Sequence, residues 1–432
     1  MNNHISESQY NLHFRREEAQ RLGKYLQERR SVNLIGMRRV GISNFLRFFL
    51  YHKDIAEEYS NHDQKQLFIS VDLNDLVERE IYPFWTLTLK RIVDACEVSD
   101  LPQKKTKDRI NTLFLAGIQS QDLFLVIDTI RKILHIIVQE NMAPTLFFLR
   151  FDRLQSAFNI SFFDNLEGLY DATHENLAYV FTSYRSLDSI FPTTKTTLSV
   201  FAQQMYIQPA TEKDMEIVYA SYQERYHLSL PKGIEQALFR LVAGNIQYLH
   251  LALIILDEKK GEQIATEEEL LNMLVADERI TLESEELWES LTKEEKRVLV
   301  QIAKGQIVTN EDKAKAVYLW DTGFVINETV FSSLLKYYLL QKDQEDDKKE
   351  EIIHLTRKEH LFFSVLEGQK GEICEREKII ETVWPEYKDF GVSDWAIDRL
   401  VARVRVKLRK QKSDSEIVTV RTRGYKLSSI KE

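Results

Sequence analysis

Four basic side chains near the C-terminus are spaced so that they could bind phosphate groups. Arg399, Arg403, Lys407 and Lys410 recur every three or four residues, which places them on one side of an α-helix. A helix that presents cations can contact the backbone of a nucleic acid, although such a stripe is also common on ordinary solvated helices. The apolar residues of the same stretch fall on a different face and predict packing against a core: Ile397, Leu400, Val401, Val404 and Leu408.

The segments on either side of this helix favour the nucleic-acid interpretation. Residues 417–427 predict a strand, a tight turn at Gly424 and a second strand, which together form a hairpin with Arg421 and Arg423 near its tip. Upstream, Thr356 and Glu359 have the spacing of a capping box that opens a helix. A helix followed by a basic hairpin is the order of a winged helix.

Residues 352–432 closely resemble the OmpR/PhoB-type winged-helix DNA-binding domain. The matching segments, in order, are 355–367, 373–384, 397–408 and 418–427. The resemblance implies that the helix at 399–410 enters the major groove of double-stranded DNA and that the hairpin contacts the neighbouring minor groove or backbone. Thr422 departs from the family pattern, which usually has glycine there. The DNA-binding residues implied are Arg399, Arg403, Lys407, Lys410, Arg421, Arg423 and Tyr425.

Charge and composition agree with a DNA-binding end on an acidic body. The chain of 432 residues carries a formal net charge of -9, yet residues 352–432 hold 17 Lys+Arg against 13 Asp+Glu, which leaves 41 against 54 for residues 1–351. Cys96 and Cys374 are isolated, so no disulfide framework and no metal site is predicted. With no apolar run of membrane length and no signal-peptide pattern, we expect a cytoplasmic protein that does not contact membranes.

The N-terminal half carries a second phosphate-binding pattern. An apolar strand at 31–35 is followed by a glycine loop and an apolar helix, which is the order of a P-loop with the spacing GxxxxGK[ST]. Ile42 occupies the lysine position, so the cation that neutralises the β- and γ-phosphates is absent there. Arg38 and Arg39 could compensate from within the loop. The retained cofactor-binding residues are Gly36, Arg38, Arg39, Gly41 and Ser43.

This half resembles the STAND and archaeal-type AAA-like ATPases. In that family an apolar strand ends in an Asp-Glu pair before an FDRL-like segment, here residues 151–154. The alignment puts Leu149 and Arg150 at the pair, so the magnesium ligand and the water-activating carboxylate are both replaced, and Asp152 lies three residues late. Together with Ile42 this predicts a pseudo-ATPase with no catalytic residue, metal or cofactor. Binding of ATP and Mg²⁺ without turnover stays open.

The predicted fold class is α/β: a P-loop NTPase-like parallel sheet with a helical lid, followed by α+β winged-helix domains. In the ATPase family the sensor of the terminal phosphate would be Thr182, Ser183 or Arg185, and residues 243–249 resemble a lid segment. The predicted domains are a degenerate AAA/STAND-like core at 1–205, the lid at 206–283, a winged-helix-like adaptor at 284–340, a charged linker at 341–351 and the DNA-binding domain at 352–432.

These patterns predict a DNA-binding protein that regulates transcription, with the pseudo-ATPase module used for scaffolding, sensing or oligomerisation. The expected partners are double-stranded DNA, a second copy of the chain, and RNA polymerase or another protein through residues 284–340 or the loop from Trp384 to Val392. Two alternatives stay open. One is a STAND-type nucleotide switch, and the other is a DNA-maintenance or defence factor that assembles on DNA.

Overall fold

The computed structural model describes most of the chain and divides it into two compact units, Met1–Gln341 and Lys342–Glu432. The described residues are 6–58, 64–99, 104–154, 157, 160–191, 202–226, 229–259, 264–348, 355–384, 394–410, 415–420 and 423–429. Within this part of the chain no helix is long and apolar enough to cross a membrane.

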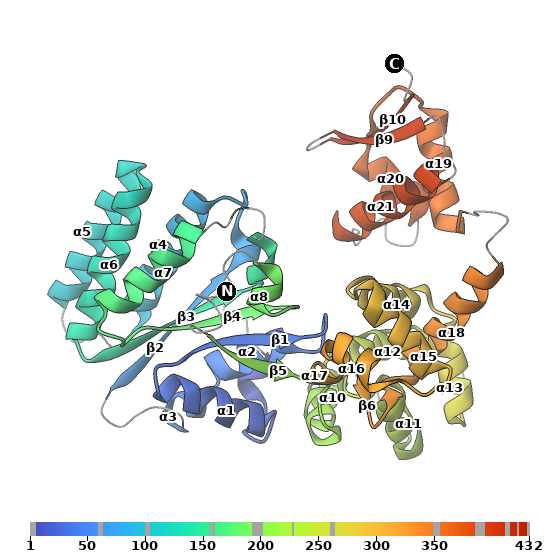
Figure 1. Ribbon diagram of the computed structural model, residues 1–432, viewed down its shortest axis with the longest axis horizontal. Helices are drawn as coiled ribbons and strands as arrows, with labels where there is room; N and C mark the ends of the chain where they lie inside the picture. Colours follow the sequence, from blue (N-terminus) through green and yellow to red (C-terminus); the bar gives the residue numbers. More distant parts are fainter. Residues whose placement is uncertain are drawn as a thin grey trace. The chain divides into compact units, whose positions relative to one another are not determined.

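The first unit is organised around a five-stranded parallel sheet with the order β2-β3-β4-β1-β5 (Figure 1). Both β1 and β4 are buried along their whole length, as expected for a parallel sheet that helices cover on both faces. The strands are β1 Ser31–Gly36, β2 Lys65–Asp72, β3 Met142–Leu149, β4 Ala178–Ser183 and β5 Ala202–Ile207.

Alternate side chains of these strands enter two separate cores. Val180 of β4 packs with residues of α1 and α2, whereas Tyr179 and Phe181 pack with α4, α6 and α7 on the opposite face. Figure 1 shows the two helical layers with the sheet between them. The helices of this part are η1 Ser6–Gln9, α1 Arg16–Gln27, α2 Ile42–Tyr51, α3 Lys53–Glu58, η2 Leu73–Asp75, α4 Ile81–Val98, α5 Lys104–Ser120, α6 Leu123–Gln139, η3 Phe151–Leu154, α7 Ile160–Ala172 and α8 Leu187–Ile190.

The helical region that follows β5 shares the core of α1 and α2. Leu253 of α12, Leu299 of α15 and Leu335 of α18 belong to the same buried cluster as Phe45 of α2. The segment predicted as an adaptor therefore packs as part of the first unit and has no separate core. The elements are α10 Glu212–Tyr226, α11 Lys232–Val242, α12 Ile246–Glu258, α13 Glu267–Val275, α14 Glu278–Glu289, α15 Lys293–Ala303, α16 Asn310–Lys315, α17 Tyr318–Asp321, β6 Val325–Ile326, β7 Thr329–Val330 and α18 Ser333–Lys348.

The predicted linker at 341–351 begins as a helix. Helix α18 continues to Lys348, because glutamine, lysine and glutamate have high helix propensity even where no apolar residue can pack. Residues 349–351 lie outside the described part of the chain. The boundary between the two compact units thus falls within α18.

The second unit has the elements of a winged helix. Three helices pack against a three-stranded antiparallel sheet with the order β8-β10-β9, and the predicted capping box of Thr356 and Glu359 opens the first helix. The predicted apolar face of α21 is buried in the core of this unit. The elements are α19 Arg357–Gly368, β8 Cys374–Glu375, α20 Arg376–Val383, α21 Asp394–Lys410, β9 Ser415–Val420 and β10 Gly424–Ser429.

Candidate nucleic-acid interface and nucleotide site

The P-loop glycines allow two close contacts between neighbouring segments. A Cβ atom at Gly36 would lie 2.9 Å from the carbonyl oxygen of Ile207, and one at Gly41 would lie 2.7 Å from the side chain of Ile246. Gly41 also has a φ of 104°, which favours glycine. In this structure the lid segment at Ile246 therefore packs directly against the loop. Ser43 is exposed.

The two loop arginines face carboxylates of helix α14. The guanidinium of Arg39 lies 3.0 Å from Glu283 and 2.9 Å from Glu286, and that of Arg38 lies 3.3 Å from Glu286. The two glutamate side chains are only 2% and 6% exposed, and a buried carboxylate is costly unless it is paired with a cation. We call these four residues the lid clamp. The cations expected to replace the missing lysine thus meet protein carboxylates.

Arg15 also joins the loop to the lid. This buried residue has a φ of 45°, and its side chain donates hydrogen bonds of 3.1 Å to the carbonyl oxygens of Val40 and Gln208. Its backbone N–H donates to Asp214 at 2.6 Å. One guanidinium therefore connects the P-loop and the end of β5, while the same residue's backbone holds the first lid helix.

An arginine also occupies the position where the magnesium-binding acids were expected. Arg150, at the end of β3, donates to both carboxylate oxygens of Asp72, at 2.6 and 2.5 Å, and its backbone N–H donates to Thr182. Burial raises the pKa of Asp152, although the nearby charges of Arg38 and Arg150 oppose this shift. Among the described residues no group of three or more His, Cys, Asp or Glu could hold a metal ion.

The predicted sensor residues are engaged within the protein. Arg185 donates to both oxygens of Glu295, at 2.6 and 2.7 Å, and lies 3.7 Å from the ring centroid of Tyr318. Burial alone would raise the pKa of Glu295, but hydrogen bonds from Arg185 and from a backbone N–H lower it below its usual value. Ser183 hydrogen-bonds with Asn33 at 3.0 Å. Of the residues expected to sense a phosphate, Arg185 instead contacts α15, and Ser183 joins β4 to β1.

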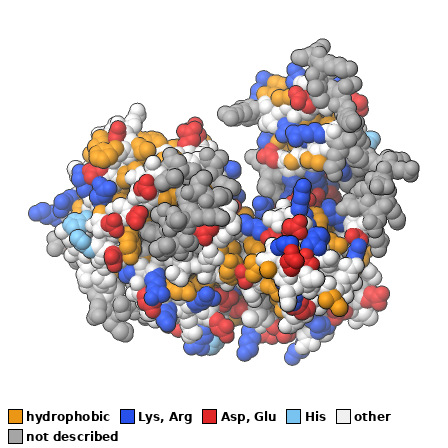
Figure 2. Space-filling view, viewed as in Figure 1, with side chains coloured by type: hydrophobic (Ala, Val, Ile, Leu, Met, Phe, Trp, Pro, Cys, Tyr) orange, Lys and Arg blue, Asp and Glu red, His pale blue; other side chains and the backbone are white. Residues whose placement is uncertain are grey.

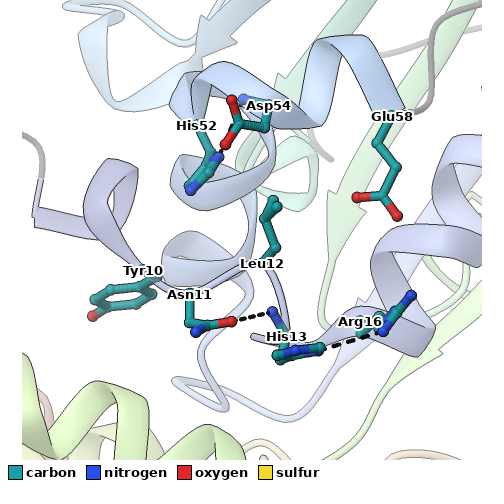
Figure 3. Close-up of a pocket in the computed structure, with 8 residues that line it drawn as sticks. All are labelled: Tyr10, Asn11, Leu12, His13, Arg16, His52, Asp54 and Glu58. Atoms are coloured by element: carbon teal, nitrogen blue, oxygen red, sulfur yellow. Dashed lines mark hydrogen bonds between the residues drawn. The ribbon is translucent and has the colours of Figure 1, made fainter.

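A separate open cavity of about 540 Å³ lies between the segment before α1 and the α2–α3 connection (Figure 3). The amide N–H of Asp54 donates to His52, and the ring of His13 lies 3.4 Å from Arg16. Glu58 and Tyr10 also line the cavity. Its charged groups have mixed signs and come from short segments on one side of the unit. None of the P-loop residues lines it.

In the second unit, part of the predicted basic stripe on α21 is paired with Glu359. This side chain is buried, with 1% exposure, and it contacts both Lys407 and Arg403. Burial alone would raise its pKa, but the hydrogen bond from Lys407, the backbone N–H of Thr356 and the charge of Arg403 lower it. The side chains of Arg403 and Lys407 are 22% and 26% exposed. Their pairing with Glu359 therefore stabilises the domain, and their contact with DNA stays a prediction.

Other basic residues of the unit lie at the surface or outside the described part of the chain. Arg399 is half-buried, and Arg423 in the hairpin is exposed. The side chain of Lys410 lies outside the described residues, as do Arg421 and residues 385–392 of the predicted partner loop. Arg409, which was not predicted as a site residue, is exposed on α21. The sequence could have predicted it, because Arg409 lies four residues after Arg405 and therefore on the same side of the helix.

The prediction that Tyr425 contacts DNA does not fit its burial. The ring is 1% exposed, its hydroxyl group donates to Asp398, and Arg376 donates to the same hydroxyl at 3.2 Å. Successive side chains of a strand point to opposite faces of the sheet. Tyr425 lies on the face that points into the core. The tyrosine therefore ties β10 to α20 and α21.

Arg405 has a structural role that the sequence did not reveal. Its guanidinium donates to the carbonyl oxygen of Ile417 and to the hydroxyl of Thr419, both at 2.8 Å. These bonds fix the β9–β10 hairpin against α21. A helix and a hairpin that are joined in this way can contact one DNA duplex together.

Comparison with known proteins gives distant structural likenesses for most of the chain. A Walker-type ATPase of Pyrococcus abyssi has 17% identity and a TM-score of 0.48, with 77% of this chain and 96% of that chain covered. The ORC2 protein of Aeropyrum pernix has 13% identity and a TM-score of 0.47, with 78% and 96% covered. Residues 349–427 match the family described as transcriptional regulatory protein, C terminal, so the second unit is a winged-helix DNA-binding domain of that kind.

Proposed function

We propose that this chain is a transcriptional regulator that reads double-stranded DNA with α21 and the β9–β10 hairpin. The observation that carries the proposal is the pairing of these two elements. Arg405 holds them together, and each presents an exposed arginine, Arg409 on the helix and Arg423 on the hairpin. Winged helices use a helix and a hairpin in this way to contact neighbouring grooves or backbone.

The DNA-binding test uses full-length protein and sequencing of the genomic fragments that it retains. The test variant is Arg409→Glu with Arg423→Glu, which reverses two exposed charges. We expect the wild type to enrich a discrete motif upstream of genes and the variant to lose most of the retained DNA. A variant with Lys24→Glu and Arg21→Glu, on an exposed face of α1, is the matched control and should retain the motif.

One further outcome would overturn the regulator assignment, and another would overturn only the two assigned contacts. Retention of DNA without a motif, together with stoichiometric assembly along it, would favour the DNA-maintenance or defence factor. Unchanged motif enrichment by the double-glutamate variant would show that the two arginines do not contact DNA. Arg403 and Lys407 are less suitable for this test because their removal also leaves Glu359 buried without its cations.

The P-loop module in this proposal serves as a scaffold, a sensor or an oligomerisation surface without nucleotide turnover. Phosphoryl transfer depends on positioned positive charge, whereas Arg38 and Arg39 are neutralised by Glu283 and Glu286 of the lid clamp. Arg150 at the end of β3 adds a guanidinium, bonded to Asp72, where a metal ligand is needed. These contacts support a module that stays closed without a ligand.

Thermal unfolding with and without millimolar ATP and Mg²⁺ tests this second part of the proposal. A ligand that binds only the folded state at a hundred times its Kd would stabilise it by about 2.7 kcal/mol, so a shift of several degrees would be visible. We expect no shift. A stabilisation that disappears in Gly41→Asp would instead support the STAND-type nucleotide switch.

The proposed partners also include other proteins and a second copy of the chain. Residues 284–340 present exposed apolar side chains at Ile307 and Val317, and the loop beginning at Trp384 is the segment expected to reach RNA polymerase. We propose a cytoplasmic location, consistent with a role on DNA. Crosslinking of the full chain on its DNA site, with and without RNA polymerase, tests these contacts.

A further inference from the structure

The middle of the outer face of α21 is apolar. Ala402 and Val406 lie one helical turn apart and are both exposed, Val406 at 50%. The other large apolar side chains that the structure describes on this helix are buried in the core. On the second unit Figure 2 shows hydrophobic side chains at the surface next to Lys and Arg side chains.

Basic side chains flank this apolar pair on both sides. Arg403 and Arg409 each lie three residues from Val406, which places them about 60° to either side of it around the helix axis. Arg403 leans toward Glu359, and Arg405, on the same side as Arg409, leans toward β9. Arg403 and Arg405 are therefore directed away from Val406, to opposite edges of the face.

This arrangement matches the chemistry of the major groove of DNA. A helix in that groove meets phosphates along both walls and base edges at the floor, where thymine alone presents a methyl group. We propose that Val406, with Ala402 beside it, reads thymine methyl groups by apolar contact, while the flanking basic residues contact phosphates. This inference rests on the proposed function, because it requires α21 to enter the groove.

The test removes the methyl group from the DNA and leaves every hydrogen-bonding atom in place. A duplex is first selected from a random pool with the full-length wild-type protein. Each thymine of that duplex is then replaced singly by deoxyuridine, and affinity is measured by fluorescence anisotropy at fixed salt. We expect the wild type to bind about fourfold more weakly at one or two positions, the effect of removing one methyl group from an apolar contact.

Substitutions at position 406 connect that loss to the valine. In Val406→Ala the penalty for deoxyuridine at those positions should disappear, whereas Val406→Ile should keep it because it retains a branched apolar side chain. Val418→Ala, at an exposed valine of β9, is the matched control and should show the full wild-type penalty. Val406 is half exposed, so its replacement leaves the core of the domain unchanged.

The outcomes separate this inference from the proposed function. A selected motif with no thymine sensitive to deoxyuridine, or a penalty that persists in Val406→Ala, would overturn the methyl readout alone. Failure of the wild type to select any sequence would overturn both the readout and the regulator assignment. Loss of the penalty in the Val418→Ala control would assign the contact to the hairpin instead of Val406.

Discussion

The loop after β1 and the helix α21 both place arginine beside buried glutamate, but with different charge balance. In the lid clamp two arginines meet two glutamates. On α21 two cations share the single carboxylate of Glu359, and Arg409, two residues after Lys407, lies exposed. A neutral clamp holds a fold closed, whereas an excess of positive charge attracts a polyanion.

The two regions also differ in what their contacts join. The pair of Arg38 and Glu286 spans 248 residues and connects the sheet to the lid. The pair of Glu359 and Lys407 stays within the small winged-helix unit and spans 48 residues. The first contact fixes how two parts of one unit pack, while the second shapes a surface.

The largest effect is expected from removing both acids of the lid clamp. Glu283→Gln with Glu286→Gln leaves Arg38 and Arg39, each about one-third exposed, without their carboxylates. Breaking buried ion pairs is strongly destabilising, but the partial exposure of the arginines reduces this effect. We therefore expect the free energy of unfolding, measured with urea, to fall by about 3 kcal/mol. Glu289→Gln on the same helix, in an exposed 3.4 Å pair with Lys296, should lose less than about 0.5 kcal/mol. Equal losses in the two variants would contradict a stabilising clamp.

A somewhat smaller loss of stability is expected when Glu359, the buried glutamate that contacts α21, is replaced. Glu359→Gln removes a buried carboxylate and one half of a capping box, so the second unit should lose about 2 kcal/mol. The released charges of Arg403 and Lys407 should also tighten DNA binding at low salt and steepen its salt dependence. Anisotropy titrations at several salt concentrations measure this. Glu367→Gln, exposed on the same helix, should change neither quantity, and a weaker affinity in Glu359→Gln would argue that its cations do not face DNA.

Removing the exposed arginines should lower DNA affinity without altering the fold. Arg409→Ala with Arg423→Ala removes two expected phosphate contacts, which would reduce the slope of log K against log salt by about 2 and weaken binding roughly tenfold at moderate salt. Unfolding curves should stay within about 0.5 kcal/mol of wild type, as for most surface substitutions. An unchanged slope would place the DNA contacts elsewhere on the unit.

The smallest effect is the loss of stability expected when the pH is lowered from neutral, and it should appear in both units. Glu295 and Glu359 have a folded-state pKa below their ordinary value, so their pairs stabilise the fold fully above the unfolded glutamate pKa of about 4.3. That stabilisation is lost as the pH falls below about 4.3 and through the folded pKa. Urea unfolding at a series of pH values from neutral down to below the folded-state pKa measures it. Arg185→Ala should flatten the acid-induced loss of the first unit, and an unchanged profile would contradict a charged Glu295 pair.

Local sequence patterns determined most of the elements. The buried strands at 31–36 and 178–183, the capping box at Thr356 and the apolar face of α21 were all predictable. They depend on residue periodicity and on capping within a few neighbouring residues. That Ile42, Leu149 and Arg150 replace motif residues follows from the resemblance to a known family and stays a prediction.

Only the tertiary structure decided which charges meet. The sequence placed Arg38 and Arg39 in a phosphate-binding loop, but the packing of α14 supplied Glu283 and Glu286 as their partners. In the second unit, the packing of the sheet against the helices likewise buried Tyr425 in the core. Ion pairs depend on distances of a few ångströms between segments far apart in the chain, and the order of the strands and the packing of the helices set those distances. The residue types were therefore fixed by the sequence, and their partners by the fold.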